Sequence, residues 1–218
     1  MTKPKTSNKV NGTRGRTNHK DARLKDIVMK AAHLFYQNGY ARTTTREIAE
    51  AAGISKGLLY YYISSKEDFL GLFIDTAIES FGGYNQEILD MLPKVSSAVA
   101  LKRAVKEFIT GLDALQDMIL FWYHESRYMT RSQLAKVIEQ ELSVIAFFEA
   151  ILDAGNKKGE FSEEDTNLAA YQIHALCINW ALKRWYLRNR YSLEDYISKI
   201  QKSSLAIAGY RGTGKFNG

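Results

Sequence analysis

The sequence contains few of the residues that cross-link or interrupt a chain. Among its 218 residues, cysteine occurs once, at Cys177, and proline twice, at Pro4 and Pro93. One cysteine cannot form a disulfide within the chain, and the apolar neighbours of Cys177 predict a small buried side chain rather than a redox sensor. This cysteine usage is typical of the reducing cytoplasm. The scarcity of proline permits long, uninterrupted helices.

Long apolar runs are also missing. The most apolar segments, MILFWY at 118–123 and the stretch around 168–187, are too short or carry charges, so no membrane span is expected. The first twenty residues lack the apolar core of a secretory signal and the amphipathic pattern of a transit peptide. No segment alternates between apolar and polar residues over the length of a strand. We therefore expect an all-α protein located in the cytoplasm.

Motifs that would indicate an enzyme are absent as well. His124 and Glu125 are not followed by a second histidine at the spacing of a helical zinc site, so a hydrolase that uses them with His174 is not expected. The sequence has no phosphate-binding glycine loop and no nucleophile elbow. We expect neither catalysis nor a metal or cofactor.

What the sequence does contain is a helix-turn-helix pattern at residues 44–66, TTREIAEAAGISKGLLYYYISSK. Thr44 and Glu47 have the spacing of a capping box, in which each side chain accepts a hydrogen bond from the backbone N–H of the other. Gly53 supplies a sharp exit from this first short helix, because a residue with a Cβ resists that conformation. Ser55 is placed to cap the second helix.

The second helix of this pattern has an unusual outward face. Leu59 and Ile63 are four residues apart and face inward. The outward side then carries Lys56, Gly57, Leu58, Tyr60 and Tyr61. A DNA duplex explains why leucine and tyrosine are exposed together, because leucine can contact a thymine methyl and tyrosine can bond phosphate oxygens.

The same periodicity also fits a plain corner between two helices, and the charge distribution argues against that alternative. Residues 1–66 carry thirteen Lys and Arg against four Asp and Glu, a net charge of +9. The remaining residues carry seventeen basic and twenty acidic side chains, a net charge of −3. A basic segment confined to one end is the pattern expected for phosphate binding there.

Within residues 26–75 the motifs AAHLF, NGY, TTREIAEAAGISKG, a tyrosine and SKEDF follow one another in order. This run closely resembles the N-terminal DNA-binding domain of the TetR family of transcriptional regulators. Two positions depart from the family pattern: Ile63 stands where an aromatic residue is frequent, and Leu58 where a small residue is frequent. The resemblance therefore implies the fold, whereas the departure at Leu58 leaves the base preference open.

The resemblance also implies a role for each matching position. Phosphate contacts are implied for Thr44, Thr45, Arg46 and Lys66, with Tyr60 and Tyr61 on the opposite side of the groove. Base contacts are implied for the residues at the start of the second helix, Ser55, Lys56, Gly57 and Leu58. We expect Lys56 to contact guanine, with a phosphate contact as the alternative. For Thr44 the alternative is a helix cap and nothing more.

The patterns divide the chain into four segments: a disordered basic arm at 1–19, a helix-turn-helix domain at 20–66, a helical ligand-binding and dimerisation domain at 67–210, and a flexible tail at 211–218. In the arm, Arg14 and Arg16 either enter a minor groove or add only non-specific affinity. We expect a first helix at 20–38, ended by Gly39, and further helices at 67–83, 97–115, 116–129, 132–157, 163–189 and 193–208. Gly82 and Gly83 should end the helix at 67–83, and Ser162 should cap the one at 163–189.

The family resemblance implies a homodimer in which the last two helices of each subunit form a four-helix bundle. A two-fold protein would match a two-fold DNA operator. Candidate interface residues are Ala169, Gln172, Leu176, Ile200, Ser204 and Ile207, with packing inside the chain as the alternative for each.

A pocket for a small apolar ligand is implied among the middle helices. Its candidate residues are Phe121, Trp122, Tyr123, Glu125, Tyr128, Phe148, Tyr171, His174 and Trp180, although core packing also explains most of the aromatic ones. The strings WYHESRYM and GNKKGEFSEED and the pattern INW…RWY…YSLEDY resemble regulators that respond to fatty acids or acyl-CoA. This second resemblance implies a phosphate-bearing head group near Lys102, Arg103 or Arg184.

Together these features predict a sequence-specific DNA-binding regulator, a repressor that a small apolar ligand such as a fatty acid or acyl-CoA releases from its operator. A ligand-independent architectural protein is the alternative. Salt dependence separates the two, because a specific regulator keeps tight binding to one site at physiological salt whereas a coating protein loses affinity uniformly.

Overall fold

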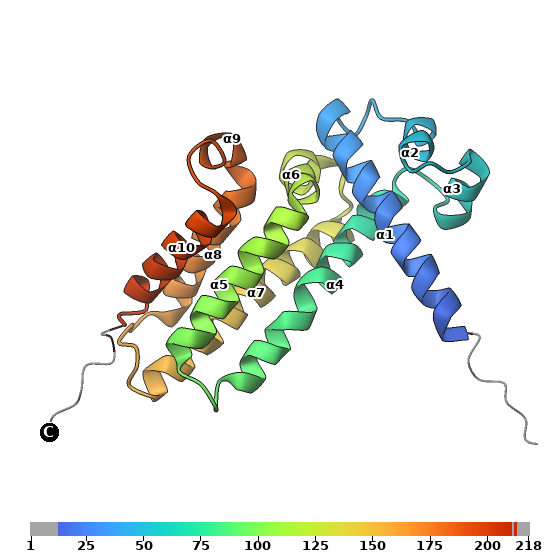
Figure 1. Ribbon diagram of the computed structural model, residues 1–218. Coiled ribbons are helices and arrows are strands. Elements are labelled where there is room, and N and C mark those ends of the chain that lie inside the picture. Colours follow the sequence, from blue (N-terminus) through green and yellow to red (C-terminus); the bar gives the residue numbers. More distant parts are fainter. Residues whose placement is uncertain (1–12, 211, 213–218) are drawn as a thin grey trace, which may run out of the picture. The chain divides into compact units, whose positions relative to one another are not determined.

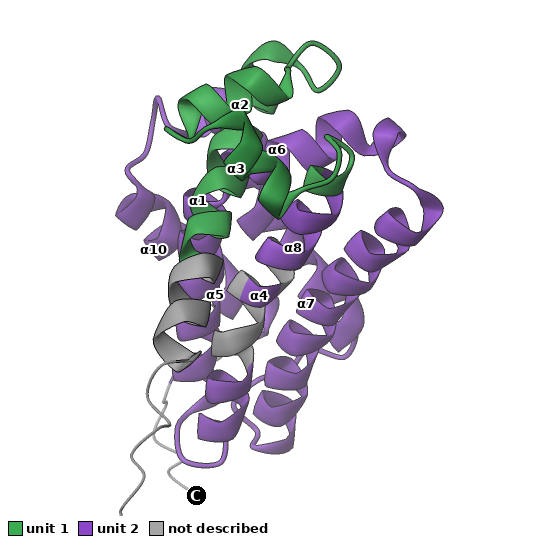
Figure 2. Cartoon of the chain, turned by 90° about the vertical axis from the view of Figure 1, so that its right-hand side faces the viewer, with its two compact units in different colours: residues 1–69 green, residues 70–218 purple. Residues whose placement is uncertain are grey.

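The computed structural model describes residues 13–210 and 212, and leaves out the side chains of residues 13–21, 77, 78 and 80–85. The chain divides into two compact units, residues 1–69 and 70–218 (Figure 2). Every regular element in the described part is a helix, and no strand occurs there (Figure 1). The predicted all-α fold is therefore confirmed. Within the same residues, no helix has the length and apolar character that a membrane span requires.

The first unit contains α1 (Thr13–Asn38), α2 (Thr45–Ala51), α3 (Lys56–Tyr62) and the start of α4 (Asp68–Met91). Its core is made by side chains that are almost completely buried, among them Ile27, Ala31, Phe35, Ile48, Leu59, Ile63 and Phe69. The rings of Phe35 and Phe69 meet edge to face with their centroids 6.0 Å apart. Ile63 is buried, so an aliphatic side chain fills this core position.

Local signals place the short helices as the sequence predicted. Gly39 has φ +81° at the end of α1, and Gly53 has φ +63° in the turn after α2. Thr44 and Glu47 form the capping box: the Thr44 hydroxyl accepts from the Glu47 N–H at 3.2 Å, and the Glu47 carboxylate accepts from the Thr44 N–H at 2.6 Å. Ser55 caps α3 by accepting from the Leu58 N–H at 3.1 Å. These contacts fix where α2 and α3 begin.

The second unit contains the rest of α4 and the helices that follow: α5 (Ser97–Ala114), α6 (Gln116–Glu125), the 3-10 turn η1 (Ser126–Tyr128), α7 (Arg131–Lys157), α8 (Thr166–Leu182), α9 (Arg184–Leu187) and α10 (Leu193–Ile207). Helix α5 packs against α7, α8 and α10 (Figure 1). Its buried face includes Leu101, Val105, Phe108 and Leu112. The core of this unit therefore surrounds α5.

Several predicted boundaries were wrong. Helix α4 continues through Gly82 and Gly83 to Met91, because a glycine costs a helix interior only about 1 kcal/mol whereas Pro93 restricts the residue before it. Helix α1 begins at Thr13, inside the segment predicted as a disordered arm, and residues 1–12 lie outside the description. No proline stands between Pro4 and Pro93, so nothing in the sequence prevents α1 from extending toward its N-terminus.

The helix predicted at 163–189 is in fact two helices. It begins at Thr166 because Asp165, rather than Ser162, accepts the capping hydrogen bond from the Leu168 N–H at 2.9 Å. It breaks at Lys183, where the side chain of Gln116 donates to the carbonyl groups of Trp180 and Ala181 at 3.4 Å each. A contact with a distant helix occupies these carbonyls, and no glycine or proline marks the break.

Candidate DNA-binding surface and effector pocket

Helix α3 presents the side chains that the sequence placed outward. Leu58, Tyr60 and Tyr61 are 41%, 45% and 68% exposed, whereas Leu59 between them is fully buried. A Cβ added at Gly57 would meet no atom within 4 Å, so the backbone of α3 is uncovered there. This face contributes little to the core of its unit and is available to a partner.

The start of α2 lies next to the same face. The Thr45 hydroxyl is 3.3 Å from the Tyr60 hydroxyl, so these two side chains approach each other from α2 and α3. Arg46 is largely exposed and forms an ion pair with Glu50 at 2.9 Å, one helical turn away. The hydrogen bonds that Thr44 donates from its backbone and side chain lower the pKa of Glu47, so this carboxylate stays charged at neutral pH.

Lys56, at the first position of α3, has its ammonium group 5.7 Å from the centre of the Tyr60 ring. This contact places the charge beside the exposed face of α3 and not in the core. The side chain is long enough to reach either a base edge or a phosphate from this position.

Lys66 has a different environment from the one that the sequence predicted. Its ammonium group donates to the carbonyl oxygens of Tyr40, Ala41 and Thr43 at 2.7, 3.3 and 3.1 Å. The same group lies 4.4 Å from the centre of the Tyr40 ring. Lys66 therefore ties the residues just before α4 to the loop between α1 and α2, a contact that no local pattern in the sequence indicated.

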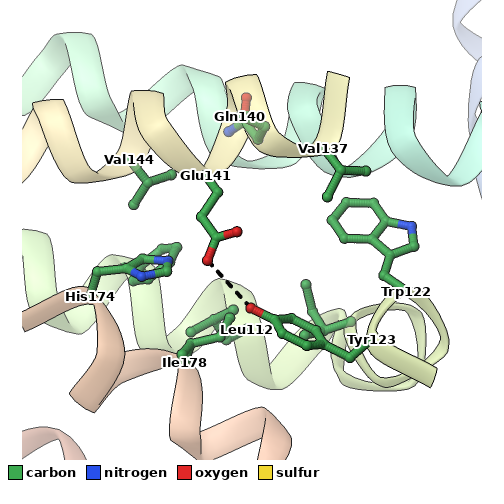
Figure 3. Close-up of a pocket in the computed structure, with 11 residues that line it drawn as sticks. Leu112, Trp122, Tyr123, Val137, Gln140, Glu141, Val144, His174 and Ile178 are labelled. Atoms are coloured by element: carbon green, nitrogen blue, oxygen red, sulfur yellow. Dashed lines mark hydrogen bonds between the residues drawn. The ribbon is translucent and has the colours of Figure 1, made fainter. Parts of the chain in front are cut away.

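In the second unit, a hollow of about 50 Å³ lies among α5, α6, α7 and α8 (Figure 3). Most of its wall is apolar, and its four polar side chains, Tyr123, Gln140, Glu141 and His174, come from α6, α7 and α8. The full lining is Phe108, Leu112, Ile119, Trp122, Tyr123, Val137, Gln140, Glu141, Val144, His174 and Ile178. An apolar hollow with a few convergent polar groups is the usual form of a small-molecule site.

The polar side chains of the hollow interact with one another. The Tyr123 hydroxyl donates to the Glu141 carboxylate at 3.4 Å (Figure 3). Tyr123 is 50% exposed, and its partial burial, followed by the charge of Glu141, raises its pKa to about 12, so the phenol keeps its proton. His174 is only 4% exposed, and burial lowers its pKa although Glu141 acts in the opposite direction. At neutral pH the imidazole of His174 is therefore uncharged, and Glu141 is the acidic side chain of the hollow.

Two larger hollows adjoin this one. One of about 210 Å³ shares Trp122, Tyr123, Val137 and Glu141 with it, and one of about 640 Å³ lies between α7 and α8. Glu141 lines all three hollows. We call the small hollow and its 210 Å³ neighbour the Glu141 pocket.

The predicted ligand residues fall into three groups: those that line a hollow, those that pack in the core, and Glu125 and Tyr128. Trp122, Tyr123 and His174 line the Glu141 pocket, and Tyr171 lines the 640 Å³ hollow. The buried rings of Phe121, Phe148 and Trp180 serve the core: Phe121 packs on Phe73, Phe148 packs on Phe108, and the Trp180 indole N–H donates to Asp113 at 2.8 Å. Glu125 pairs with Arg127 at 3.2 Å, and Tyr128 lies in η1 with a partly exposed ring.

Glu141 is the acidic residue of the pocket, and it was not among the residues predicted from the sequence. It stands in the run EQELS, which has the composition of an exposed helix face. The available signal was its spacing: Val137, Glu141, Val144 and Phe148 follow one another at intervals of four, three and four residues, so Glu141 interrupts an apolar stripe of α7.

The basic residues proposed for a phosphate-bearing head group do not line these hollows. Arg103 forms an ion pair with Glu87 at 3.1 Å, and Arg184 forms one with Asp117 at 3.0 Å. Neither lysine nor arginine is among the residues that line the three hollows. No group of three or more His, Cys, Asp and Glu suited to a metal ion occurs in the described part of the chain.

The predicted dimer residues also divide. Ala169, Ile200 and Ser204 are buried inside the chain, and Gln172 is exposed on α8. Large apolar side chains that remain exposed on α7 and α8 are Leu134, Ile138, Leu142, Leu168 and Tyr171. Cys177 is buried as predicted, and burial raises the pKa of its thiol.

Comparison with known proteins agrees with this arrangement. The family model of bacterial regulatory proteins of the tetR family matches residues 27–71, and that of the tetracyclin repressor-like C-terminal domain matches residues 96–195. The transcriptional regulator HbdR of Aromatoleum sp. is 28% identical over 180 residues, which cover 82% of this chain and 77% of HbdR. The regulator QacR of Staphylococcus aureus is 30% identical over 160 residues, which cover 72% of this chain and 82% of QacR.

The fold itself is found in solved structures. AibR, in a complex with isovaleryl coenzyme A and operator DNA, superposes with a TM-score of 0.65 at 18% identity, covering 83% of this chain and 97% of AibR. The two curated relatives are transcriptional regulators and not enzymes, in agreement with the absence of catalytic motifs. From its two matching domains and its similarity to QacR over most of that protein, the chain belongs to the TetR family of DNA-binding transcriptional regulators.

Proposed function

We propose that this regulator is a repressor that occupies a two-fold operator and is released by a small apolar effector. The observation that carries the proposal is the exposed face of α3, on which Leu58, Tyr60 and Tyr61 lie outside the core. Exposed apolar and aromatic side chains on a short helix, beside an uncovered glycine backbone, suit insertion into a major groove. Occupancy of the groove by the protein then blocks other proteins from the same DNA.

On the DNA, the residues of α3 and α2 have different roles. Lys56 and Leu58, at the start of α3, contact base edges, and the uncovered backbone at Gly57 permits close approach. Thr45, Arg46 and the tyrosines of α3 contact phosphates, which position the helix without reading sequence. Thr44 caps α2, and Ser55 caps α3. Lys66 holds the loop before α2 in place through its three carbonyl contacts.

The repressor acts as a homodimer. Two α3 helices must reach successive major-groove faces, about 34 Å apart, on one side of the duplex. Exposed apolar side chains on α8, Leu168 and Tyr171, support a subunit interface on this helix, with the outward face of α10 beside it. The protein is located in the cytoplasm, where its operator is.

The effector binds in the Glu141 pocket, and its acyl or aromatic part fills the hollow beside Trp122. AibR, which has the same fold, binds an acyl-CoA. An acyl-CoA would place its acyl part in the pocket here, with its phosphates outside, because no basic side chain lines the hollows. By linkage, a ligand that weakens DNA binding must bind the DNA complex more weakly by the same factor.

A footprint of the purified protein on the DNA upstream of its own coding sequence tests the proposal. We expect one protected two-fold site at physiological salt, and loss of protection when acyl-CoAs of graded chain length are added. Lys56→Ala should weaken binding and relax sequence choice, whereas Tyr60→Phe should weaken binding to all sequences alike. Uniform protection of any DNA would favour the architectural alternative, and protection that no ligand alters would remove the effector from the proposal.

A further inference from the structure

The polar groups of the Glu141 pocket point to the chemistry of its ligand. We infer that the part of the effector that enters this pocket carries no negative charge and donates a hydrogen bond to Glu141, as a hydroxyl or a neutral N–H group does. This inference rests on the proposal that the pocket is the effector site. It adds a rule of selection that neither the family nor the sequence supplies.

The Glu141 pocket is lined by an acidic side chain and by no basic one. Glu141 projects from α7 into the hollow toward Tyr123 (Figure 3). No lysine or arginine lines the pocket to neutralise a second carboxylate. A ligand carboxylate placed here would lie beside a like charge, which opposes binding. We therefore expect a free fatty acid to bind with its carboxylate away from Glu141.

Glu141 and Tyr123 together offer a ligand hydrogen-bond acceptors. A carboxylate accepts hydrogen bonds and donates none, and it has room for about four. The single phenol proton of Tyr123 is directed to Glu141, so Tyr123 offers only acceptor capacity to a ligand. The pocket end formed by these two side chains is thus rich in acceptors and suits a ligand donor, whereas the buried indole N–H of Trp122 supplies a donor on another part of the wall.

The aliphatic walls of the hollow favour a neutral donor group on the ligand over a cationic one. Leu112, Val144 and Ile178 form aliphatic walls around the carboxylate. A full positive charge is attracted by Glu141 but loses more hydration against these walls than a hydroxyl does. A neutral apolar group with one donor meets both the walls and Glu141.

Four naphthalene probes of nearly equal size test the inference on the full-length protein. These are 2-naphthol, a neutral donor; 2-methoxynaphthalene, which lacks a donor; 2-naphthoate, an anion; and 2-naphthylmethylammonium, a cation. Their binding at pH 7 is measured by calorimetry and by quenching of tryptophan fluorescence. We expect 2-naphthol to bind about 10- to 100-fold more tightly than 2-methoxynaphthalene, since a hydrogen bond to a charged acceptor has about that effect. We expect 2-naphthoate to bind most weakly.

The variant Glu141→Gln removes the charge and keeps a carbonyl oxygen for Tyr123. It should reduce the preference for 2-naphthol over 2-naphthoate by about tenfold or more. Glu139→Gln is the matched control, because Glu139 is an exposed glutamate of the same helix and does not line the pocket. It should leave the preference unchanged. Melting curves of both variants show that they are folded before binding is compared.

The possible results bear on two different proposals, one on the chemistry of the ligand and the other on the position of the effector site. Equal binding of all four probes, or tightest binding of the anion or of the cation, overturns the inference and leaves the pocket as an apolar effector site. An unchanged preference in Glu141→Gln also overturns it, because the selection then arises elsewhere. Saturable binding by none of the probes overturns the pocket as the effector site, while the footprint on operator DNA tests the repressor independently.

Discussion

Replacing Lys66 with methionine separates two roles for this residue. The TetR resemblance implies a phosphate contact, whereas the structure places the ammonium group on three backbone carbonyls. Lys66→Met keeps the length and the apolar stem of the side chain and removes its charge and donors. The two roles then predict different changes in stability and in the salt dependence of DNA binding.

The expected loss of stability follows from the contacts of Lys66. A hydrogen bond from a charged donor contributes about 1.5–3 kcal/mol, and a cation over an aromatic ring contributes about 0.5–2 kcal/mol. Lys66 is partly exposed, so water replaces some of these contacts in the variant. We expect the free energy of unfolding to fall by about 2 kcal/mol, with faster hydrogen exchange in the loop between α1 and α2.

DNA binding gives the second measurement. A lysine that neutralises one phosphate contributes about 0.9 to the slope of log affinity against log salt. Lys66→Met should weaken binding because the loop before α2 loosens, with the slope unchanged, whereas Lys56→Met should lower the slope when Lys56 contacts phosphate. Stability equal to that of the native protein, together with a slope lowered by about 1, would refute the structural role of Lys66.

Four further substitutions test other parts of the structure. Gly57 lies in a helix with open space around it, so Gly57→Ala should stabilise the free protein by about 0.5 kcal/mol in urea denaturation. The same change should weaken DNA binding. Equal DNA affinity would contradict close approach of the DNA at α3. Gly53→Ala, at φ +63°, should instead cost about 1–2 kcal/mol, and a neutral effect would contradict the backbone argument. In the native protein the folded-state pKa of His174 is lowered from 6.5, so the contribution of His174 to the free energy of unfolding is complete above pH 6.5. That contribution is lost as the pH falls below 6.5, by at most about 1.4 kcal/mol per pH unit. His174→Phe should remove this dependence on pH. The carboxyl groups with lowered pKa affect stability only below about pH 4.5. If the free energy of unfolding of the native protein is the same at pH 7 and pH 5, the assignment of this pH dependence to His174 is excluded. Gly155→Ala places a Cβ 2.0 Å from the Phe161 ring and should destabilise the protein by about 2 kcal/mol. Combining it with Phe161→Ala should cost less than the two single changes together, and strictly additive costs would contradict the clash.

The helix-turn-helix could be predicted from the sequence because its signals are local. Each boundary depends on residues within four positions: Thr44 with Glu47, Gly53 in its turn, and Ser55 with Leu58. The exposed face of α3 then followed from helical spacing around Leu59. Such contacts are encoded in short stretches of sequence, so one chain was enough to place them.

Contacts between distant residues could not be predicted in this way. The break after α8 depends on Gln116, more than sixty positions away in the chain, and the ammonium group of Lys66 meets carbonyls of residues 40–43. The aromatic residues of the second unit present the same difficulty. Phe121 and Trp122 are neighbours in sequence and both are buried, yet one packs in the core and the other lines the pocket.

Glu141 offers a test of the proposal that the pocket serves a ligand. A carboxylate in a mostly apolar hollow is unfavourable unless hydrogen bonds offset its lost hydration, and Tyr123 supplies one such bond at 3.4 Å. A side chain needed only for packing would be more stable as leucine or methionine at this position of α7, between Val137 and Val144. We therefore expect the carboxylate to lower the stability of the empty protein, and a ligand that donates to it to recover that loss. Replacing Glu141 with leucine should raise the free energy of unfolding and abolish the preference for 2-naphthol; a decrease in stability would mean that Glu141 serves the fold.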